Sequence, residues 1–184
     1  MITVYLSGPI TGKTFKEAEE KRLFVAEQLR AAGFRVLDPL RGKSYVLSHQ
    51  RKPIKEHDAK KNPTLSDKAL KSRDKLDTLS CEIVLADFSE PAMITVEDIL
   101  HMRGISVEGV STEILEAAID LASIGSIFEV AWAEDHNKLV VAVIPAEHSV
   151  HNHAFVRESA VIYETLEEAV RYIISCGVEE IKRD

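Results

Sequence analysis

Residues 122–143 read ASIGSIFEVAWAEDHNKLVVAV, and this stretch predicts a loop, an amphipathic helix and a buried strand in succession. Small residues form the loop, the helix spans Ile127–His136, and the strand is the β-branched apolar run Leu139–Ile144. Glu129 falls in the first turn of that predicted helix. A helix N-terminus has unpaired N–H groups and a positive dipole end, so it can hold a carboxylate or a phosphate. Glu129 is therefore a candidate nucleophile, and the alternative is a glutamate that only stabilises its own helix.

The same alternation of strand and helix continues on both sides of this stretch. Further strands are predicted over Ile2–Leu6, Phe34–Leu37, Glu82–Ala86 and Ala160–Tyr163, and helices over Phe15–Ala32, Ser66–Leu79, Val96–Met102, Thr112–Ala122 and Leu166–Ser175. Five short strands alternating with helices predict a three-layer α/β/α fold with a five-stranded parallel sheet, of the Rossmann or flavodoxin-like type. We expect residues 1–184 to form a single domain, with 91–122 as an inserted helical segment. In such sheets the ligand binds beyond the carboxyl ends of the strands.

Composition and charge exclude several classes of protein. The chain has 184 residues, of which 45% are hydrophobic and 29% charged, as in ordinary globular domains. A net charge of −7 argues against a nucleic-acid surface, although a single nucleotide could still bind in a local positive site. Cys81 and Cys176 do not make a disulfide framework. The sequence shows neither a membrane-spanning run nor a signal peptide, so we expect a cytoplasmic protein.

A glycine-containing turn, SGPITGKT at residues 7–14, follows the first predicted strand. It nearly matches the phosphate-binding pattern G-x-x-x-x-G-K-[ST], with Ser7 in place of the first glycine. Asp87, after another apolar strand, could then hold a metal ion, and the protein would be a phosphotransferase that uses Lys13. However, Pro9 removes an N–H group from a loop that works by donating them. We favour a turn that touches the sugar or base of a ligand.

Three other sets of residues have both a functional and an ordinary interpretation. Tyr5 is either a core tyrosine or a hydroxyl donor to a carboxylate across a pocket. Arg73 and Asp74 are either a solvated helix face or part of a site. The cluster of acidic and histidine side chains within 147–153 has a spacing that could bind a metal, but no matching Cys or His pair occurs elsewhere, so we favour a polar loop.

Taken together, these residues resemble the nucleoside 2-deoxyribosyltransferase family, which includes the deoxynucleoside 5′-monophosphate N-hydrolases. The resemblance rests on VYLSGPI at 4–10, on Arg73-Asp74 ahead of IVLAD at 83–87, on SIGSIFEVAWA at 123–133, and on Lys138 and Asn152. The family's nucleophile motif is usually Gly-x-x-x-Glu-Leu-Gly-x-Ala, and Ala131 replaces its second glycine here. The resemblance covers most of the chain.

The resemblance implies a retaining mechanism of glycosidic cleavage without a metal or other cofactor. Glu129 would form a covalent glycosyl intermediate, Tyr5 would orient it, and Asp74 would protonate the departing base. The residues implied to bind substrate are Ser7, Gly8, Ile10, Asp87, Ser123, Gly125, Ser126 and Asn152. Asn152 would reach a neighbouring subunit's site, so we expect a homodimer or a larger homo-oligomer.

One departure from the family pattern bears on the substrate. Transferases of the family typically carry an aspartate six residues before the nucleophile, where this chain has Ser123. A serine hydroxyl with helix N-terminal amides can accept a phosphate that an aspartate would repel. This slightly favours hydrolysis of a 5′-monophosphate over transfer to another base. A non-catalytic nucleotide-binding protein is a further alternative.

Overall fold

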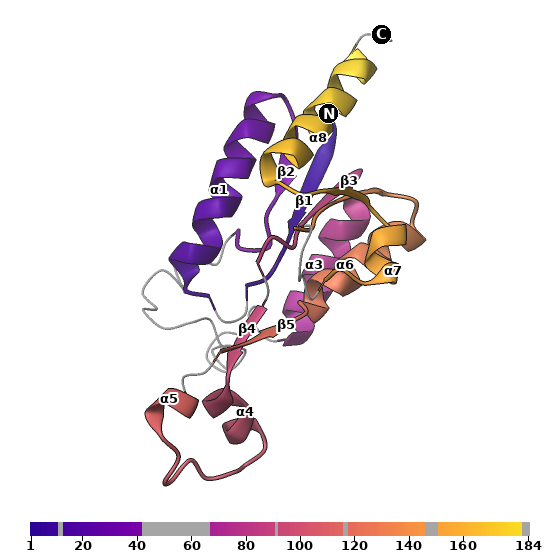
Figure 1. The fold of residues 1–184 in the computed structure, drawn as a ribbon. Coiled ribbons are helices and arrows are strands. Elements are labelled where there is room, and N and C mark those ends of the chain that lie inside the picture. Colours follow the sequence, from indigo (N-terminus) through magenta and orange to yellow (C-terminus); the bar gives the residue numbers. More distant parts are fainter. Residues whose placement is uncertain (11–12, 42–66, 91, 116–117, 146–150, 182–184) are drawn as a thin grey trace.

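The structure, a computed structural model, describes residues 1–10, 13–41, 67–90, 92–115, 118–145 and 151–181. Its main sheet contains β1 (Thr3–Ser7), β2 (Arg35–Leu37), β3 (Ile83–Asp87), β6 (Leu139–Val143) and β7 (Val161–Tyr163). All neighbouring strands pair in parallel, in the order β2-β1-β3-β6-β7 (Figure 1). The predicted five-stranded parallel sheet is therefore confirmed, and its order is the flavodoxin-like one.

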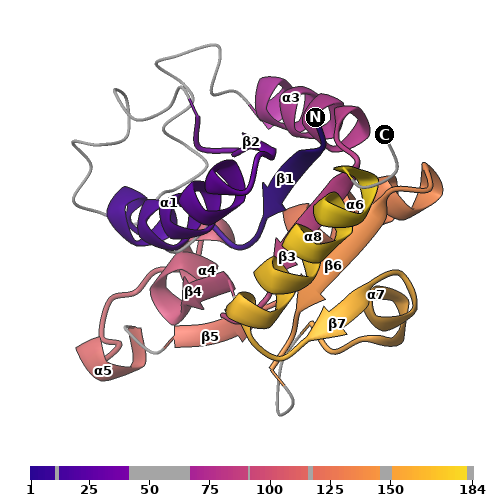
Figure 2. The same cartoon turned by 90° about the horizontal axis from the view of Figure 1, so that it is seen from above.

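Helices cover both faces of this sheet (Figure 2). Helices α1 (Phe15–Ala31) and α8 (Leu166–Ile181) lie on one face, and α3 (Asp67–Ser80), α6 (Ile124–Asp135) and α7 (Ala154–Glu158) lie on the other. Two separate apolar clusters fill the two interfaces between the helices and the sheet. The fold is thus the three-layer α/β/α arrangement that the sequence predicts.

Strand β1 divides its side chains between these two layers. Val4 and Leu6 join the cluster under α1 and α8, whereas Tyr5 joins the cluster under α3 and α6. Alternate side chains of a strand point to opposite faces, so Ser7 lies on the same face as Tyr5. In the β1–β3 pairing Ser7 is opposite Ala86, which places Ser7 at the carboxyl edge of the sheet beside Asp87. This edge, where the strand order reverses between β1 and β3, is where such folds bind ligands.

Helix α1 is fixed at both ends by local sequence signals. The hydroxyl of Thr14 accepts from the amide of Glu17, whose carboxylate in turn accepts from the amide of Thr14, a complete capping box. Gly33 follows the helix with a φ of +88°, a conformation that costs glycine little. Phe15, Ala18, Arg22, Val25, Ala26 and Leu29 form the buried side of the helix.

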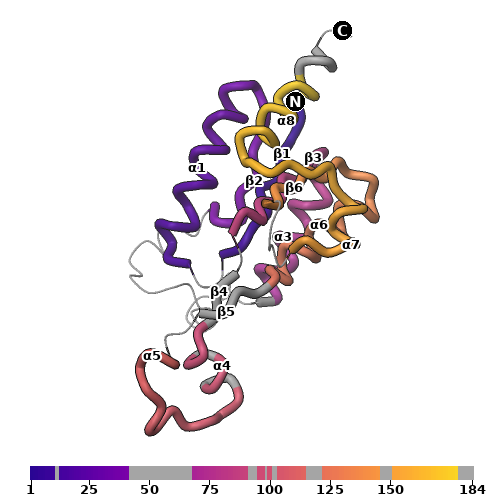
Figure 3. The backbone as a smooth tube through the Cα atoms, viewed as in Figure 1, coloured from indigo at the N-terminus to yellow at the C-terminus, as the bar shows by residue number. Residues whose placement is uncertain are grey.

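The segment between β3 and α6 differs from its prediction. Val96–Met102 is a helix, α4, as predicted, but the predicted helix Thr112–Ala122 is wrong. Of the described residues in that range, Thr112–Leu115 (α5) is helical, and Ala118–Leu121 (β5) pairs antiparallel with Ala92–Thr95 (β4). The pairing with β4 overrides the local helix preference. This segment extends from the carboxyl edge of the main sheet (Figure 3).

Two smaller differences concern the C-terminal part. Helix α7 is not predicted from the sequence, and α8 continues beyond the expected Ser175 to Ile181. Among the described residues, no helix is both long and apolar enough to cross a membrane.

Candidate active site

The carboxylate of Glu129 is the centre of the site. Glu129 lies on α6 with only 8% of its surface exposed. It accepts one hydrogen bond from the hydroxyl of Tyr5, at 2.7 Å, and one from the hydroxyl of Ser7, at 2.5 Å. Each carboxylate oxygen thus receives one donor from β1 and keeps a lone pair for another partner. The structure therefore brings together two of the predicted catalytic residues and one predicted substrate-binding residue.

The groups that hold the carboxylate of Glu129 are not the helix amides that the sequence analysis predicts. Helix α6 begins at Ile124, with Ser123 at the N-cap, so Glu129 is in the second turn and not the first. Its carboxylate does not use the free amides of the helix N-terminus. The two hydroxyl groups of β1 hold it instead, and the N-terminal amides are left for another group.

Burial changes the ionisation of this carboxylate. Desolvation raises the pKa of Glu129 from its ordinary value to about 7, against the opposing effect of the Ser7 and Tyr5 hydrogen bonds. Asp74 raises the same pKa and Arg22 lowers it. Burial, followed by the charge of Glu129, raises the pKa of Tyr5 well above its usual range. Tyr5 therefore stays protonated and remains a hydrogen-bond donor.

The raised pKa of Glu129 predicts a pH-dependent stability. Between its ordinary value of 4.5 and about 7, the folded chain binds the proton of this carboxyl group and the unfolded chain does not. The free energy of unfolding should therefore fall as pH rises through this window, by on the order of 3 kcal/mol. Urea unfolding of the wild type and of Glu129→Gln from pH 5 to 8.5 measures it. The free energy of unfolding of the glutamine variant should rise relative to that of the wild type as pH rises. A difference in free energy that stays constant with pH would contradict the prediction.

Asp74 approaches the same site from α3. Its charge raises the pKa of both Glu129 and Tyr5, which places it on the side of the sheet that carries the nucleophile candidate. Arg73 contacts the Asp74 carboxylate at 3.1 Å and also donates to the carbonyl of Pro39. Both Arg73 and Asp74 are half-buried, so they are not a solvated helix face.

The N-terminus of α6 forms a second part of the site. The hydroxyls of Ser123 and Ser126 lie 2.9 Å apart, and Ser126 is buried whereas Gly125 is exposed. The amide of Ser123 donates to Nε2 of His151 at 2.7 Å. His151 is 1% exposed and stacks on Phe88 with ring centroids 4.2 Å apart. This buried imidazole fixes the backbone at the start of the helix.

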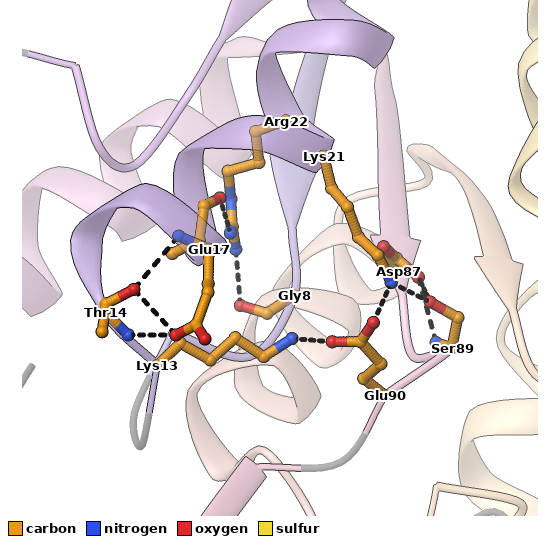
Figure 4. Close-up of polar contacts among 10 residues, drawn as sticks. Gly8, Lys13, Thr14, Glu17, Lys21, Arg22, Asp87, Ser89 and Glu90 are labelled. Carbon is orange, nitrogen blue, oxygen red and sulfur yellow. Dashed lines mark hydrogen bonds and ion pairs between the residues drawn. The ribbon is translucent and has the colours of Figure 1, made fainter. Parts of the chain in front are cut away.

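The glycine turn after β1 lies at the same carboxyl edge of the sheet, against the end of β3 (Figure 4). A Cβ atom on Gly8 would lie 2.9 Å from the carbonyl oxygen of Asp87, so only glycine lets the turn approach β3 this closely. The Asp87 carboxylate accepts from the amide and hydroxyl of Ser89, at 3.0 and 2.5 Å. Ile10 is half-buried and packs beside α1.

Other predicted residues have different surroundings. Lys13 forms an ion pair with Glu90, which neutralises the charge that the phosphotransferase alternative would use (Figure 4). Residues 11–12 of the turn lie outside the described part of the chain. Asn152 is exposed and accepts from Arg157 at 3.3 Å, and its reach into a neighbouring subunit stays a prediction.

The structure also identifies contacts that the sequence analysis did not. The bond from Ser7 to Glu129 could have been expected, because Ser7 lies two residues after Tyr5 on the same face of a strand. No local pattern indicates that Arg22, in the middle of α1, or His151, in a polar loop, points inward.

The alternative interpretation of residues 147–153 as a metal site receives no support from the described residues. Within the described ranges, no three His, Cys, Asp or Glu side chains gather closely enough to hold a metal ion. Glu147 and His148 of the predicted cluster lie outside those ranges.

Comparisons with known proteins bear on the fold. No protein-family model matches the chain, and a search of curated proteins found no match. Among solved structures, a 2-deoxyribosyltransferase from Leishmania mexicana aligns with 95% of this chain and 98% of its own, at 12% identity and a TM-score of 0.57. A 2-deoxyribosyltransferase from Bacillus psychrosaccharolyticus aligns with 91% of this chain and 90% of its own, at 13% identity and a TM-score of 0.50. A CMP N-glycosidase from Clostridium botulinum aligns with 93% of this chain and 96% of its own, at 16% identity and a TM-score of 0.47.

The two transferase structures have the fold that the resemblance seen in the sequence implies. At 12–13% identity the two transferase structures establish the arrangement of the elements and not the reaction. They extend over nearly the whole of this chain and over at least 90% of their own. The chain has the fold of the 2-deoxyribosyltransferases.

Proposed function

We propose that this protein is a retaining N-glycosidase that hydrolyses the bond between base and sugar of a nucleoside 5′-monophosphate. The observation that carries the proposal is the buried carboxylate of Glu129, held by the hydroxyls of Tyr5 and Ser7 at the carboxyl edge of the sheet. Surface glutamates need no such support. A buried carboxylate aimed by two donors is suited to stabilise a positive charge that develops on a sugar.

In the first step the C1′–N bond breaks and a bond forms between C1′ and a carboxylate oxygen of Glu129. The transition state resembles an oxocarbenium ion, so the negative carboxylate lowers its energy. The departing base nitrogen takes a proton from the carboxyl group of Asp74 on α3, which is protonated when the substrate is bound and becomes a carboxylate as the base leaves. Tyr5 keeps its own proton and holds the orientation of Glu129.

In the second step water attacks C1′ and the bond to Glu129 breaks. Asp74, left as a carboxylate, accepts the proton of that water. Two inversions at C1′ give overall retention. The same intermediate would yield a new nucleoside if another base attacked in place of water.

The start of α6 supports a phosphate at the 5′ end of the substrate. Ser123 and Ser126 place two hydroxyls at a helix N-terminus whose first-turn amides Glu129 does not occupy. Hydroxyls and such amides together favour a dianion. An aspartate at position 123 would repel that group, which favours the monophosphate over the free nucleoside.

A product assay tests the proposal directly. The protein is incubated in EDTA with ribo- and deoxyribonucleosides and with their 5′-monophosphates, with and without a second free base, and the products are separated by chromatography. We expect free base from a monophosphate, without metal and without an acceptor base. A new nucleoside formed only with acceptor base would make the protein a transferase. Turnover that requires Mg²⁺ and a nucleoside triphosphate would favour the phosphotransferase alternative, and binding without any product would favour a nucleotide-binding protein.

A further inference from the structure

Arg22 is a buried arginine in the middle of α1, and only 9% of its surface is exposed. Its guanidinium donates to the carbonyl of Ala18 at 2.9 Å and to the carbonyl of Gly8 at 2.8 Å (Figure 4). Its Nε atom lies 3.8 Å from a carboxylate oxygen of Asp38. Burying a guanidinium is unfavourable unless its hydrogen bonds are made, so this placement constrains the groups around it.

The hydrogen bond from Arg22 to the carbonyl of Gly8 holds the turn that follows β1 in place. On one side the turn lies so close to β3 that a Cβ atom on Gly8 would meet the carbonyl of Asp87, and on the other it accepts from Arg22. Gly8 directly follows Ser7, which donates to Glu129. Movement of Gly8 would therefore move a donor of the nucleophile candidate.

The charge of Arg22 also reaches Glu129. The hydroxyls of Tyr5 and Ser7 from β1 donate to this carboxylate, and the charges of Asp74 on α3 and Arg22 on α1 act on its pKa. Asp74 disfavours the ionised form of Glu129, and Arg22 favours it. A cation on this side therefore offsets part of the cost of a charged nucleophile in a buried site.

We propose that Arg22 is a positioning residue that holds the glycine turn against β3 and so keeps the hydroxyl of Ser7 on the carboxylate of Glu129. Its effect on catalysis rests on the proposed function, whereas its effect on the ionisation of Glu129 does not. In this role it acts through Gly8 and Ser7 on Glu129, and not by forming a bond with the substrate.

The test measures the pKa of Glu129 directly. Carbon-13 NMR follows the side-chain carboxyl signal from pH 4 to 9, and the loss of one signal in Glu129→Gln assigns it. Three single variants are compared with the wild type: Arg22→Met, which removes the charge and the donors, Arg22→Lys, which keeps the charge, and Arg30→Met, a control at an exposed arginine of the same helix. If Arg22→Met does not fold, Arg22→Gln replaces it and the same outcomes apply.

We expect the pKa of Glu129 to rise in Arg22→Met, because both the charge of Arg22 and the hydrogen bond from Ser7, whose position the turn fixes, lower it. It should stay near the wild-type value in Arg22→Lys and in Arg30→Met. With a cleavable substrate, the rising limb of the pH–rate profile should shift by the same amount in Arg22→Met, and KM should rise in that variant because the turn loses the hydrogen bond from the guanidinium to the carbonyl of Gly8. An unchanged pKa in Arg22→Met, or an equal shift in Arg22→Lys, would overturn the inference. Absence of glycosidic cleavage by the wild type would overturn the proposed function instead, and would leave the NMR result intact.

Discussion

Replacement of Glu129 by glutamine should lower the rate of glycosidic cleavage by about 10⁴-fold or more. Glutamine has nearly the same shape, but it is neutral and cannot form the glycosyl ester through which the reaction is proposed to pass. The fold should persist, because the amide can still pair with the hydroxyls of Tyr5 and Ser7, and because a buried group that resists ionisation is removed. The loss should fall on kcat, since the carboxylate acts at the reacting carbon.

The measurement pairs steady-state kinetics with mass spectrometry of the intact protein. A 2′-fluoro-substituted nucleotide, which slows the second step, should add one sugar phosphate to the wild type and none to Glu129→Gln. Glu134→Gln is the matched control, because Glu134 is an exposed glutamate of the same helix. If Glu129→Gln retains a tenth or more of the activity, or if the label is found on another residue, Glu129 is not the nucleophile.

The sequence is sufficient to predict the sheet, and the physical reason is burial. A central parallel strand is covered on both faces, so it appears as a continuous apolar run such as IVLA at 83–86 or LVVAV at 139–143. Such runs, separated by helices, allow few other arrangements. The pairing of Tyr5 with Glu129 spans 124 positions and follows from no local pattern. Only the resemblance to the family predicts that Tyr5 orients Glu129.

Local sequence fails where tertiary pairing decides the structure. The residues of β5 fall within the predicted helix Thr112–Ala122, and their pairing with β4 is a contact between segments more than twenty residues apart. Helix α6 begins three residues before its predicted start, because Ser123 serves as the N-cap and the small residues after it accept helical geometry. That shift moves Glu129 out of the first turn and changes the physical account of how it is held.

The layers of the fold explain why the site forms at this edge. Tyr5 and Ser7 share one face of β1, and α6 packs on that face with Glu129 directed toward them. Arg22 reaches the same edge from α1, which covers the opposite face. Groups from both helical layers can meet only where the strands end, so the carboxyl edge is the place at which a nucleophile, its donors and a cation can act on one substrate.

Replacement of Asp74 by asparagine should lower kcat by roughly 10²- to 10³-fold for substrates whose base must be protonated as it leaves. Asparagine keeps the shape of the side chain, but it cannot deliver a proton to the base nitrogen. It also removes the charge that Asp74 carries when ionised, which raises the pKa of Glu129, so the nucleophile should ionise at least as readily in this variant. Any loss of rate at pH 8 therefore reflects proton transfer to the base and not a weaker nucleophile.

A substrate that needs no proton separates these roles. An N7-methylated purine nucleotide carries a positive charge on its base, which leaves as a neutral molecule without help from an acid. In a single turnover, which follows release of the base in the first step only, Asp74→Asn should cleave it at a rate within about tenfold of the wild type, whereas Glu129→Gln should be inactive toward both substrates. Asp135→Asn is the control, since the Asp135 side chain is 80% exposed. An equal loss for the methylated and unmethylated substrates would remove Asp74 from the role of general acid and leave it as a residue that shapes the charge around Glu129.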